Sequence, residues 1–188
     1  MSQSQIPAAV AAQQKQYVTY MLPELTLGSR TITTLEARAI LASSGTTGLR
    51  TWEAALHLGT FLSSPQGLSL VKNKNVLELG AGTGFVSMLC AKNLGAKYVL
   101  ATDGSGEVVD DMKANFYLNG LEGSVLIDTA ALKWGHALID GFFDDGEAGP
   151  RFDIVLGADV VSPTSCVRSW SAPPLGLCQV HILWQMRC

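Results

Sequence analysis

The stretch Val76-Leu-Glu-Leu-Gly-Ala-Gly-Thr-Gly84 decides the fold of this chain. A short apolar strand pattern runs into glycines at every second position, and an apolar helical pattern over 85–94 follows. In open α/β sheets, a strand end, a glycine-rich turn and a helix N-terminus together form the place where ligands bind. Glycines are needed there because a ligand lies against the backbone, where a Cβ would collide. The stretch therefore predicts a ligand-binding strand, turn and helix.

Outward from this stretch, short apolar runs alternate with helical patterns, which is typical of a parallel sheet with crossover helices. We predict strands over 75–79, 98–102, 125–129 and 152–156, and helices over 85–94 and 107–118. The fold class is α/β, with a Rossmann-like, doubly wound and mostly parallel sheet.

Upstream, Thr51 can cap a helix that ends before Pro65. A short helix or strand over 35–42 leads into the polar loop 43–48, where Gly45 and Gly48 allow the backbone to approach another segment closely. Downstream, prolines and serines interrupt every window of 162–188, although 180–184 can form one more strand. We therefore expect a sheet that is incomplete after its fourth strand, with that strand partly exposed as an edge.

Composition narrows the class of protein. The 188 residues suit one domain, and 15% charged residues, against roughly 25% in typical chains, predict a buried core. A net charge of −3 argues against binding nucleic acid through its phosphates, and no apolar run is long enough to span a bilayer. Four irregularly spaced cysteines without an export signal indicate a cytosolic or nuclear protein, and we expect a cytoplasmic one. Cys178 and His181 are at most half of a zinc site, so we expect no metal.

Three polar or aromatic residues follow the later strands. Asp103 comes 19 residues after Gly84, where a carboxylate can accept hydrogen bonds from both ribose hydroxyls of an adenosine-containing ligand; the alternative is a helix cap. Trp134 is either an adenine contact or a core side chain, and Asp159 either borders the cofactor or faces solvent. Phe85 stands where a dinucleotide fingerprint needs its third glycine, which weakens the nicotinamide or flavin interpretation.

These residues carry a resemblance to a known family. Residues 76–84 with Asp103 resemble the cofactor motifs of class I S-adenosylmethionine-dependent methyltransferases. The string Gly-Thr-Thr-Gly-Leu-Arg-Thr-Trp-Glu-Ala-Ala over 45–55, with Leu-Lys-Trp-Gly over 132–135 and Gly-Ala-Asp-Val over 157–160, is more restrictive. It resembles the seven-strand protein-lysine methyltransferases. Within that family, residues 32–56 resemble most the branch that methylates translation elongation factor 2.

The resemblance implies a role for each matched position. Trp52 would line the methionine end of the cofactor, Asp103 would hold its ribose, and Trp134 would border its adenine. Asp159 would begin the motif that lines the lysine channel and would dock the substrate lysine. The cofactor loop would be formed by Glu78, Gly80, Gly82 and Gly84. Two positions depart from the family pattern: Ser162 stands at the aromatic position of the channel motif, and Lys133 replaces an aspartate.

The resemblance implies an organisation and a function. Residues 1–50 would be an N-terminal extension with a cofactor-lid segment, 51–161 the cofactor-binding core, and 162–188 an atypical tail. We expect a monomeric S-adenosylmethionine-dependent protein-lysine N-methyltransferase acting on elongation factor 2. The alternative is an inactive, truncated methyltransferase-like module that binds the cofactor or a partner. A nucleic-acid amino-methyltransferase is disfavoured because residues 158–161 lack the Pro-Pro motif of that class.

Overall fold

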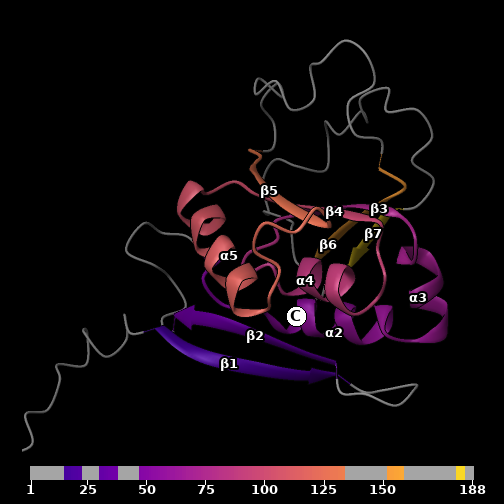
Figure 1. The fold of residues 1–188 in the computed structure, drawn as a ribbon, viewed down its shortest axis with the longest axis horizontal. Helices are drawn as coiled ribbons and strands as arrows, with labels where there is room; N and C mark the ends of the chain where they lie inside the picture. The colour runs from indigo at the N-terminus through magenta and orange to yellow at the C-terminus, as the bar shows by residue number, and fades with distance from the viewer. Residues whose placement is uncertain (1–14, 23–29, 38–46, 134–151, 159–180, 185–188) are drawn as a thin grey trace, which may run out of the picture.

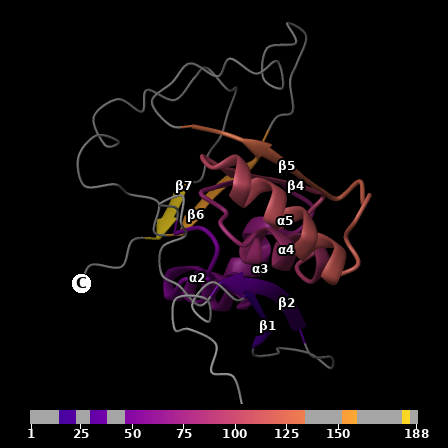
Figure 2. The same ribbon diagram turned by 90° about the vertical axis from the view of Figure 1, so that its left-hand side faces the viewer.

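The computed structural model describes residues 15–22, 30–37, 47–133, 152–158 and 181–184. Within these residues the chain forms three layers (Figure 1): a five-stranded sheet, helices packed against one of its faces, and a two-stranded hairpin beyond the helices. The same order of layers is visible after a quarter turn (Figure 2). The helices are therefore the middle layer and contribute to packing on two sides.

The sheet is parallel and places its first strand at the centre. Its strands are β3 (Asn75–Leu79), β4 (Tyr98–Asp103), β5 (Ile127–Ala131), β6 (Ile154–Ala158) and β7 (His181–Trp184), in the spatial order β5-β4-β3-β6-β7. Every neighbouring pair is parallel. The chain moves outward from β3 to β5 and then crosses to β6 on the other side of β3. The strand order therefore reverses at β3, and in open α/β sheets ligands bind at the carboxyl ends of the strands where the order reverses.

Alternation along the strands separates two apolar cores. Val76 of β3 and Ala101 of β4 pack on the helical side, whereas Leu77 and Leu100 belong to a smaller cluster with Phe152. Because successive side chains in a strand point to opposite faces, Glu78 and Asp103 share the helical side with Val76 and Ala101. The register thus directs both acidic residues of the site toward the same layer.

Four helices are described: α2 (Glu53–Leu62), α3 (Pro65–Val71), α4 (Phe85–Lys92) and α5 (Gly106–Leu118). In α4 every residue from Phe85 to Ala91 is buried. The residues of α4 are buried because this helix lies in the middle layer, with the sheet on one side and the hairpin on the other. The ring of Tyr20 from the hairpin meets the ring of Phe85 edge to face, with centroids 5.2 Å apart.

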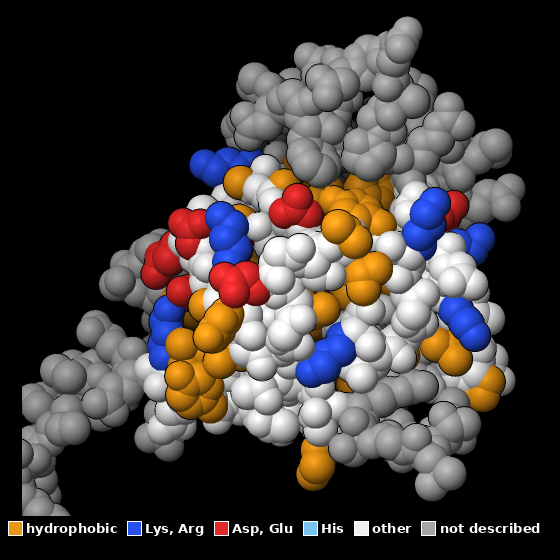
Figure 3. Space-filling model, viewed as in Figure 1, with side chains coloured by type: hydrophobic (Ala, Val, Ile, Leu, Met, Phe, Trp, Pro, Cys, Tyr) orange, Lys and Arg blue, Asp and Glu red, His pale blue; other side chains and the backbone are white. Residues whose placement is uncertain are grey.

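The hairpin pairs β1 (Lys15–Leu22) with β2 (Arg30–Ala37) in antiparallel register. Its inner face buries Ile32 and Leu22 against the helices, while Tyr17 and Met21 on β1 are exposed. Acidic and basic side chains gather over α5 and the neighbouring end of the hairpin (Figure 3), where Lys15 of β1 pairs with Asp111 of α5 at 2.6 Å. The hairpin is therefore joined to α5 as well as to α4.

The structure confirms the predicted α/β class and the parallel sheet, with β3 at the predicted residues. Strands β5 and β6 each begin two residues later than predicted, and the short element predicted over 35–42 is the strand β2, which ends at Ala37. The expected free edge at the fourth strand is wrong. Strand β6 lies between β3 and β7, because 181–184 adds a parallel strand.

Two elements were not predicted. Strand β1 was missed, and Pro65 was interpreted only as a helix terminator, whereas it is the first residue of α3. Proline suits that position because its missing N–H is one that the first helical turn leaves unpaired. Across the described residues, no helix is long and apolar enough to cross a membrane.

Candidate functional site

The glycine loop, residues Gly80 to Gly84, leaves β3 and turns directly into α4. Its three glycines all have positive φ, at 63° for Gly80, 56° for Gly82 and 77° for Gly84, which is the region that favours glycine. The turn closes with a hydrogen bond of 2.9 Å from the Gly84 N–H to the Ala81 carbonyl. The backbone of this turn therefore requires glycine at positions 80, 82 and 84.

A second glycine lies against this loop from upstream. A Cβ added to Gly82 would stand 3.2 Å from the carbonyl oxygen of Gly48, and one added to Gly48 would stand 2.8 Å from Val108. The close approach that the sequence predicted for the 43–48 loop is therefore found at Gly48, while Gly45 lies outside the described residues. Further along, the hydroxyls of Thr51 and Thr83 are 2.6 Å apart and buried. These contacts hold the segment before α2 onto the glycine loop.

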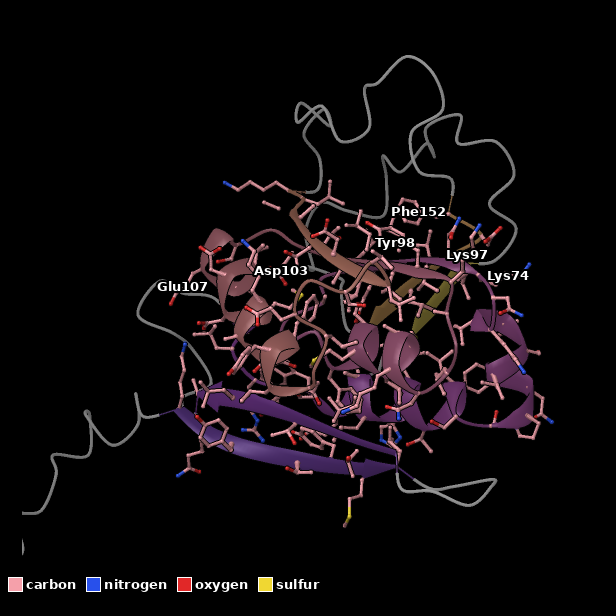
Figure 4. The ribbon with its side chains drawn as sticks, in the orientation of Figure 1. Lys74, Lys97, Tyr98, Asp103, Glu107 and Phe152 are labelled. Carbon is pink, nitrogen blue, oxygen red and sulfur yellow. The ribbon has the colours of Figure 1, made fainter. Side chains whose placement is uncertain are left out.

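Asp103 ends β4 beside the glycine loop. Its Oδ2 accepts a hydrogen bond of 3.1 Å from the Gly82 N–H, and its Oδ1 accepts one of 3.1 Å from the Ser105 N–H. Figure 4 shows Asp103 and Glu107 on the α5 side, at the opposite end of the sheet from Lys74 and Lys97. The side chain is only partly buried, and a carboxylate has about four acceptor positions. Acceptor capacity for two ligand hydroxyls therefore remains.

The alternative role of Asp103 is a helix cap, and its contacts fit that role only in part. Ser105 is the N-cap of α5 and makes no side-chain capping bond. Asp103 instead accepts from the N–H two residues on, which shapes the turn before the helix. The same carboxylate accepts from the Gly82 N–H in the loop that follows β3. Asp103 therefore also joins the turn before α5 to the glycine loop, which a helix cap alone does not require.

Glu78 is buried in β3, with 2% of its surface exposed, and faces α4. It accepts hydrogen bonds from the Ser87 hydroxyl and the Ser87 backbone N–H. Ser87 is the third residue of α4, and the N-cap of that helix, Gly84, has no side chain to satisfy this N–H. Glu78 thus supplies the cap from the neighbouring strand. Burial raises its pKa to about 7, Ser87 opposes that rise, and the charge of Asp103 adds to it.

Trp52 is the N-cap residue of α2 and is partly buried. Its indole Nε1 donates to the Thr47 carbonyl at 3.1 Å, which folds the 47–52 segment on itself. Because the preceding Thr51 contacts Thr83, the segment that carries Trp52 lies beside the glycine loop.

The structure brings the loop glycines, Glu78, Asp103 and the Trp52 segment to one end of the sheet. Trp134, Asp159, Ser162 and Cys178 lie outside the described residues. Among the residues that the structure does describe, no group of three or more His, Cys, Asp or Glu side chains could hold a metal ion.

Sequence reasoning missed Thr83 and Asn115. The side chain of Asn115 on α5 donates to the Thr83 carbonyl at 3.0 Å. The two residues are separated by 32 positions, and an asparagine within an amphipathic helix carries no local sign of its partner. Its isolated polar character on a face with Val108, Met112 and Phe116 was the available signal.

The arrangement fits an adenosine-containing cofactor. The glycine loop takes a backbone path with positive φ at Gly80, Gly82 and Gly84, and a carboxylate with spare acceptor capacity stands at the adjacent strand end. Such a site can bind and orient a cofactor. The Ser87 hydroxyl and the Glu78 carboxylate form a hydroxyl–base pair at this end, but both side chains are buried and the pair serves the α4 cap. The geometry therefore favours a reaction in which the cofactor brings the activated group.

Comparison with known proteins agrees with this fit. The protein-lysine N-methyltransferase EFM3 of Chaetomium thermophilum is 51% identical over 161 residues, covering 85% of this chain and 47% of the relative. EFM3 of Saccharomyces cerevisiae is 35% identical, covering 81% and 45%, and the human protein-lysine N-methyltransferase EEF2KMT is 30% identical, covering 76% and 42%. The chain spans a little under half the length of these curated relatives.

Among solved structures, a T. Thermophilus 16S rRNA methyltransferase in complex with AdoMet and guanosine matches 79% of this chain and 34% of its own, with 21% identity and a TM-score of 0.46. Residues 35–169 match the family described as lysine methyltransferase. Membership agrees with S-adenosylmethionine as the predicted cofactor. The match covers most of the chain, including the glycine loop and Asp103, and this chain therefore belongs to the lysine methyltransferase family.

Proposed function

We propose that this chain binds S-adenosylmethionine and is the cofactor-binding part of a protein-lysine N-methyltransferase. The observation that carries the proposal is the Asp103 carboxylate, held between the Gly82 and Ser105 N–H groups at the end of β4. In that position Asp103 accepts hydrogen bonds from the two ribose hydroxyls, and the loop of Gly80, Gly82 and Gly84 lies beside the ligand, as the family resemblance implies. Trp52 lines the methionine end and Trp134 borders the adenine, as the family resemblance implies.

Methyl transfer to lysine needs alignment and a neutral amine. When bound, the cofactor supplies a methyl group activated by its own sulfonium. A free lysine has a pKa of about 10.4, so only roughly one amine in 10³ is neutral at pH 7. A narrow apolar channel lowers that pKa because it disfavours the charged form. Asp159 docks the incoming ammonium, and its carboxylate opposes deprotonation, so we assign it no general-base role.

We propose translation elongation factor 2 as the protein substrate, in the cytoplasm. The residues that support this choice are 32–56, which include the Gly-Thr-Thr-Gly string and Trp52, and whose pattern resembles the branch acting on that factor. The alternative is a module that binds the cofactor without transferring methyl groups. Ser162, at the aromatic position of the channel motif, favours it.

Calorimetry with S-adenosylhomocysteine tests the cofactor assignment. Asp103→Ala is expected to weaken binding by at least ~100-fold, because hydrogen bonds to a charged acceptor contribute about 1.5–3 kcal/mol each. Asp110→Ala is the matched control, since Asp110 is an exposed α5 aspartate that pairs only at the surface with Lys113. Equal affinity of the parent chain and the Asp103 variant would refute the ribose role.

Methyl transfer is tested separately with labelled S-adenosylmethionine and elongation factor 2. Label in the factor supports the enzyme, and its loss in Asp159→Ala with cofactor affinity retained supports the docking role. Cofactor binding without any label in the factor would support the non-catalytic alternative.

A further inference from the structure

The outer edge of β2 is covered by the side chains of Asn115 on α5 and of Asn119, the C-cap residue of that helix. Asn119 accepts from the Thr33 N–H at 3.0 Å and donates to the Thr33 carbonyl at 2.6 Å, as the next strand of a sheet would. Asn115, one helical turn earlier, accepts from the Leu35 N–H at 2.7 Å. The edge that β1 leaves unpaired is thus satisfied by amide groups rather than by another strand.

Asn115 differs from Asn119 in what its second polar atom contacts. The Nδ2 of Asn115 donates to the Thr83 carbonyl of the glycine loop at 3.0 Å, whereas Asn119 makes its remaining contacts with Met88 and with the Asn115 carbonyl. Asn115 is 1% exposed, so water cannot replace either partner. One buried amide therefore joins the hairpin to the loop.

The Thr83 carbonyl is part of the peptide between Thr83 and Gly84, at the start of α4. Gly82, the residue before Thr83, donates its N–H to Asp103, and the Thr83 hydroxyl contacts Thr51. A shift of Thr83 would therefore disturb the loop where the cofactor is proposed to lie. Because Asn115 also accepts from the Leu35 N–H, the same shift would disturb that hydrogen bond in the hairpin.

We propose that Asn115 is a positioning residue that couples the β1–β2 hairpin to the cofactor loop, so that binding of cofactor orders the hairpin and an ordered hairpin strengthens cofactor binding. The inference rests on the proposed cofactor site. Reciprocity follows from thermodynamic linkage: whatever factor one event confers on the other is returned equally. Couplings of this kind change affinity by about 5- to 150-fold.

The test compares Asn115→Asp with Asn119→Asp. Each variant keeps the oxygen that accepts from β2 and replaces the donating NH2 with an oxygen that faces a carbonyl. Only in Asn115→Asp does that carbonyl belong to the glycine loop. Asn119→Asp loosens the junction of α5 and β2, whereas Asn115→Asp loosens the junction of α5 and the glycine loop. Both variants place a buried carboxylate against a carbonyl, so a merely structural role would affect affinity alike.

Two measurements separate the variants. By calorimetry with S-adenosylhomocysteine, Asn115→Asp is expected to bind about 10-fold more weakly, and Asn119→Asp within about 2-fold of the parent chain. By amide hydrogen exchange, the ligand is expected to slow the Thr33 and Leu35 amides in the parent and in Asn119→Asp, with no slowing in Asn115→Asp. Equal losses of affinity in the two variants, or slowing that persists in Asn115→Asp, would overturn the coupling.

If Asn115→Asp does not fold, Leu35→Pro is the second variant that tests the coupling. It removes the hairpin donor and leaves the bond between Asn115 and Thr83 in place, and it should abolish the ligand-dependent slowing at Thr33. Persistence of that slowing would count against the coupling.

Failure of the cofactor site gives a different pattern. If the parent chain binds no S-adenosylhomocysteine, the proposed function fails. The coupling is then tested without ligand, by the amide exchange rates of Gly82 and Gly84. Faster exchange of these amides in Asn115→Asp than in Asn119→Asp supports the coupling, whereas equal rates contradict it.

Discussion

Glu78 is the buried acid that caps α4, and its protonation makes the free energy of unfolding depend on pH. Its pKa rises from an ordinary 4.5 to about 7 because the carboxyl is buried. The folded chain therefore binds more protons than the unfolded chain between about pH 4.5 and 7, and the free energy of unfolding falls as pH rises through this window. The full loss above pH 7 is on the order of 3 kcal/mol.

Glu78→Gln is expected to flatten that dependence. The amide oxygen of glutamine still accepts from Ser87, but the side chain never becomes charged, so the variant should be more stable than the parent at pH 8 and similar at pH 5. Urea unfolding at both values measures this. Glu122→Gln, at an exposed carboxylate, is the control. The idea is refuted if Glu78→Gln and the parent lose stability in parallel as pH rises.

For single residues of the site, the sequence was informative where the role of the residue depends on its neighbours in the chain. Gly80, Gly82 and Gly84 follow from one strand-to-helix turn, and Asp103 follows from its place at the next strand end. The capping bond between Glu78 and Ser87 and the contact between Thr51 and Thr83 join positions 9 and 32 residues apart. No periodicity marks such partners, because their pairing is decided by how the elements pack.

At the scale of elements, α2 and α3 pack backbone against backbone. A Cβ on Gly67 of α3 would stand 2.2 Å from the Phe61 carbonyl oxygen and 2.5 Å from the Leu62 Cα. Neither atom can move without moving α2. We expect Gly67→Ala to lower the free energy of unfolding by about 3 kcal/mol, the upper range for overpacking, as measured in urea.

Gln66→Ala tests whether that loss comes from packing. Gln66 is exposed on the same helix, so its substitution should change stability by no more than about 0.5 kcal/mol. A similar small effect of Gly67→Ala would show that the two helices can separate at low cost.

The elements that were missed share one physical cause. Helix α3 begins at Pro65, a residue that also ends helices, and both the Ser64 cap and the packing of Gly67 against α2 fix it as a helix start. Strand β1 has one exposed face and finds its partner β2 across seven intervening residues, 23–29. The outer edge of β2 is closed by Asn115 and Asn119, about 80 residues away. Parallel strands were easier to predict, because burial on both faces makes β3 and β4 apolar throughout.

For the whole molecule, the order β5-β4-β3-β6-β7 predicts a pattern of amide exchange. In a parallel sheet, alternate N–H groups of a strand point to its two neighbours. Strands β3, β4 and β6 have a partner on each side, so all of their amides should exchange slowly. Within the described residues β5 pairs only with β4, so its amides should alternate between slow and fast.

The decisive strand is β6, since the sequence predicted it to be an edge and the structure places β7 beside it, with Leu156 opposite Ile182. If β7 is paired in solution, the amides of β6 will resemble those of β4, which is the internal control with two known neighbours. If β7 is not paired, β6 will alternate as β5 does, because the N–H groups that face β7 will be open to water. Exchange measured by NMR across 154–158 separates these outcomes, since core strands open only with global unfolding while unpaired edge amides do not require it. Slow exchange throughout would mean that β7, the last described strand, extends the sheet beyond β6 in solution.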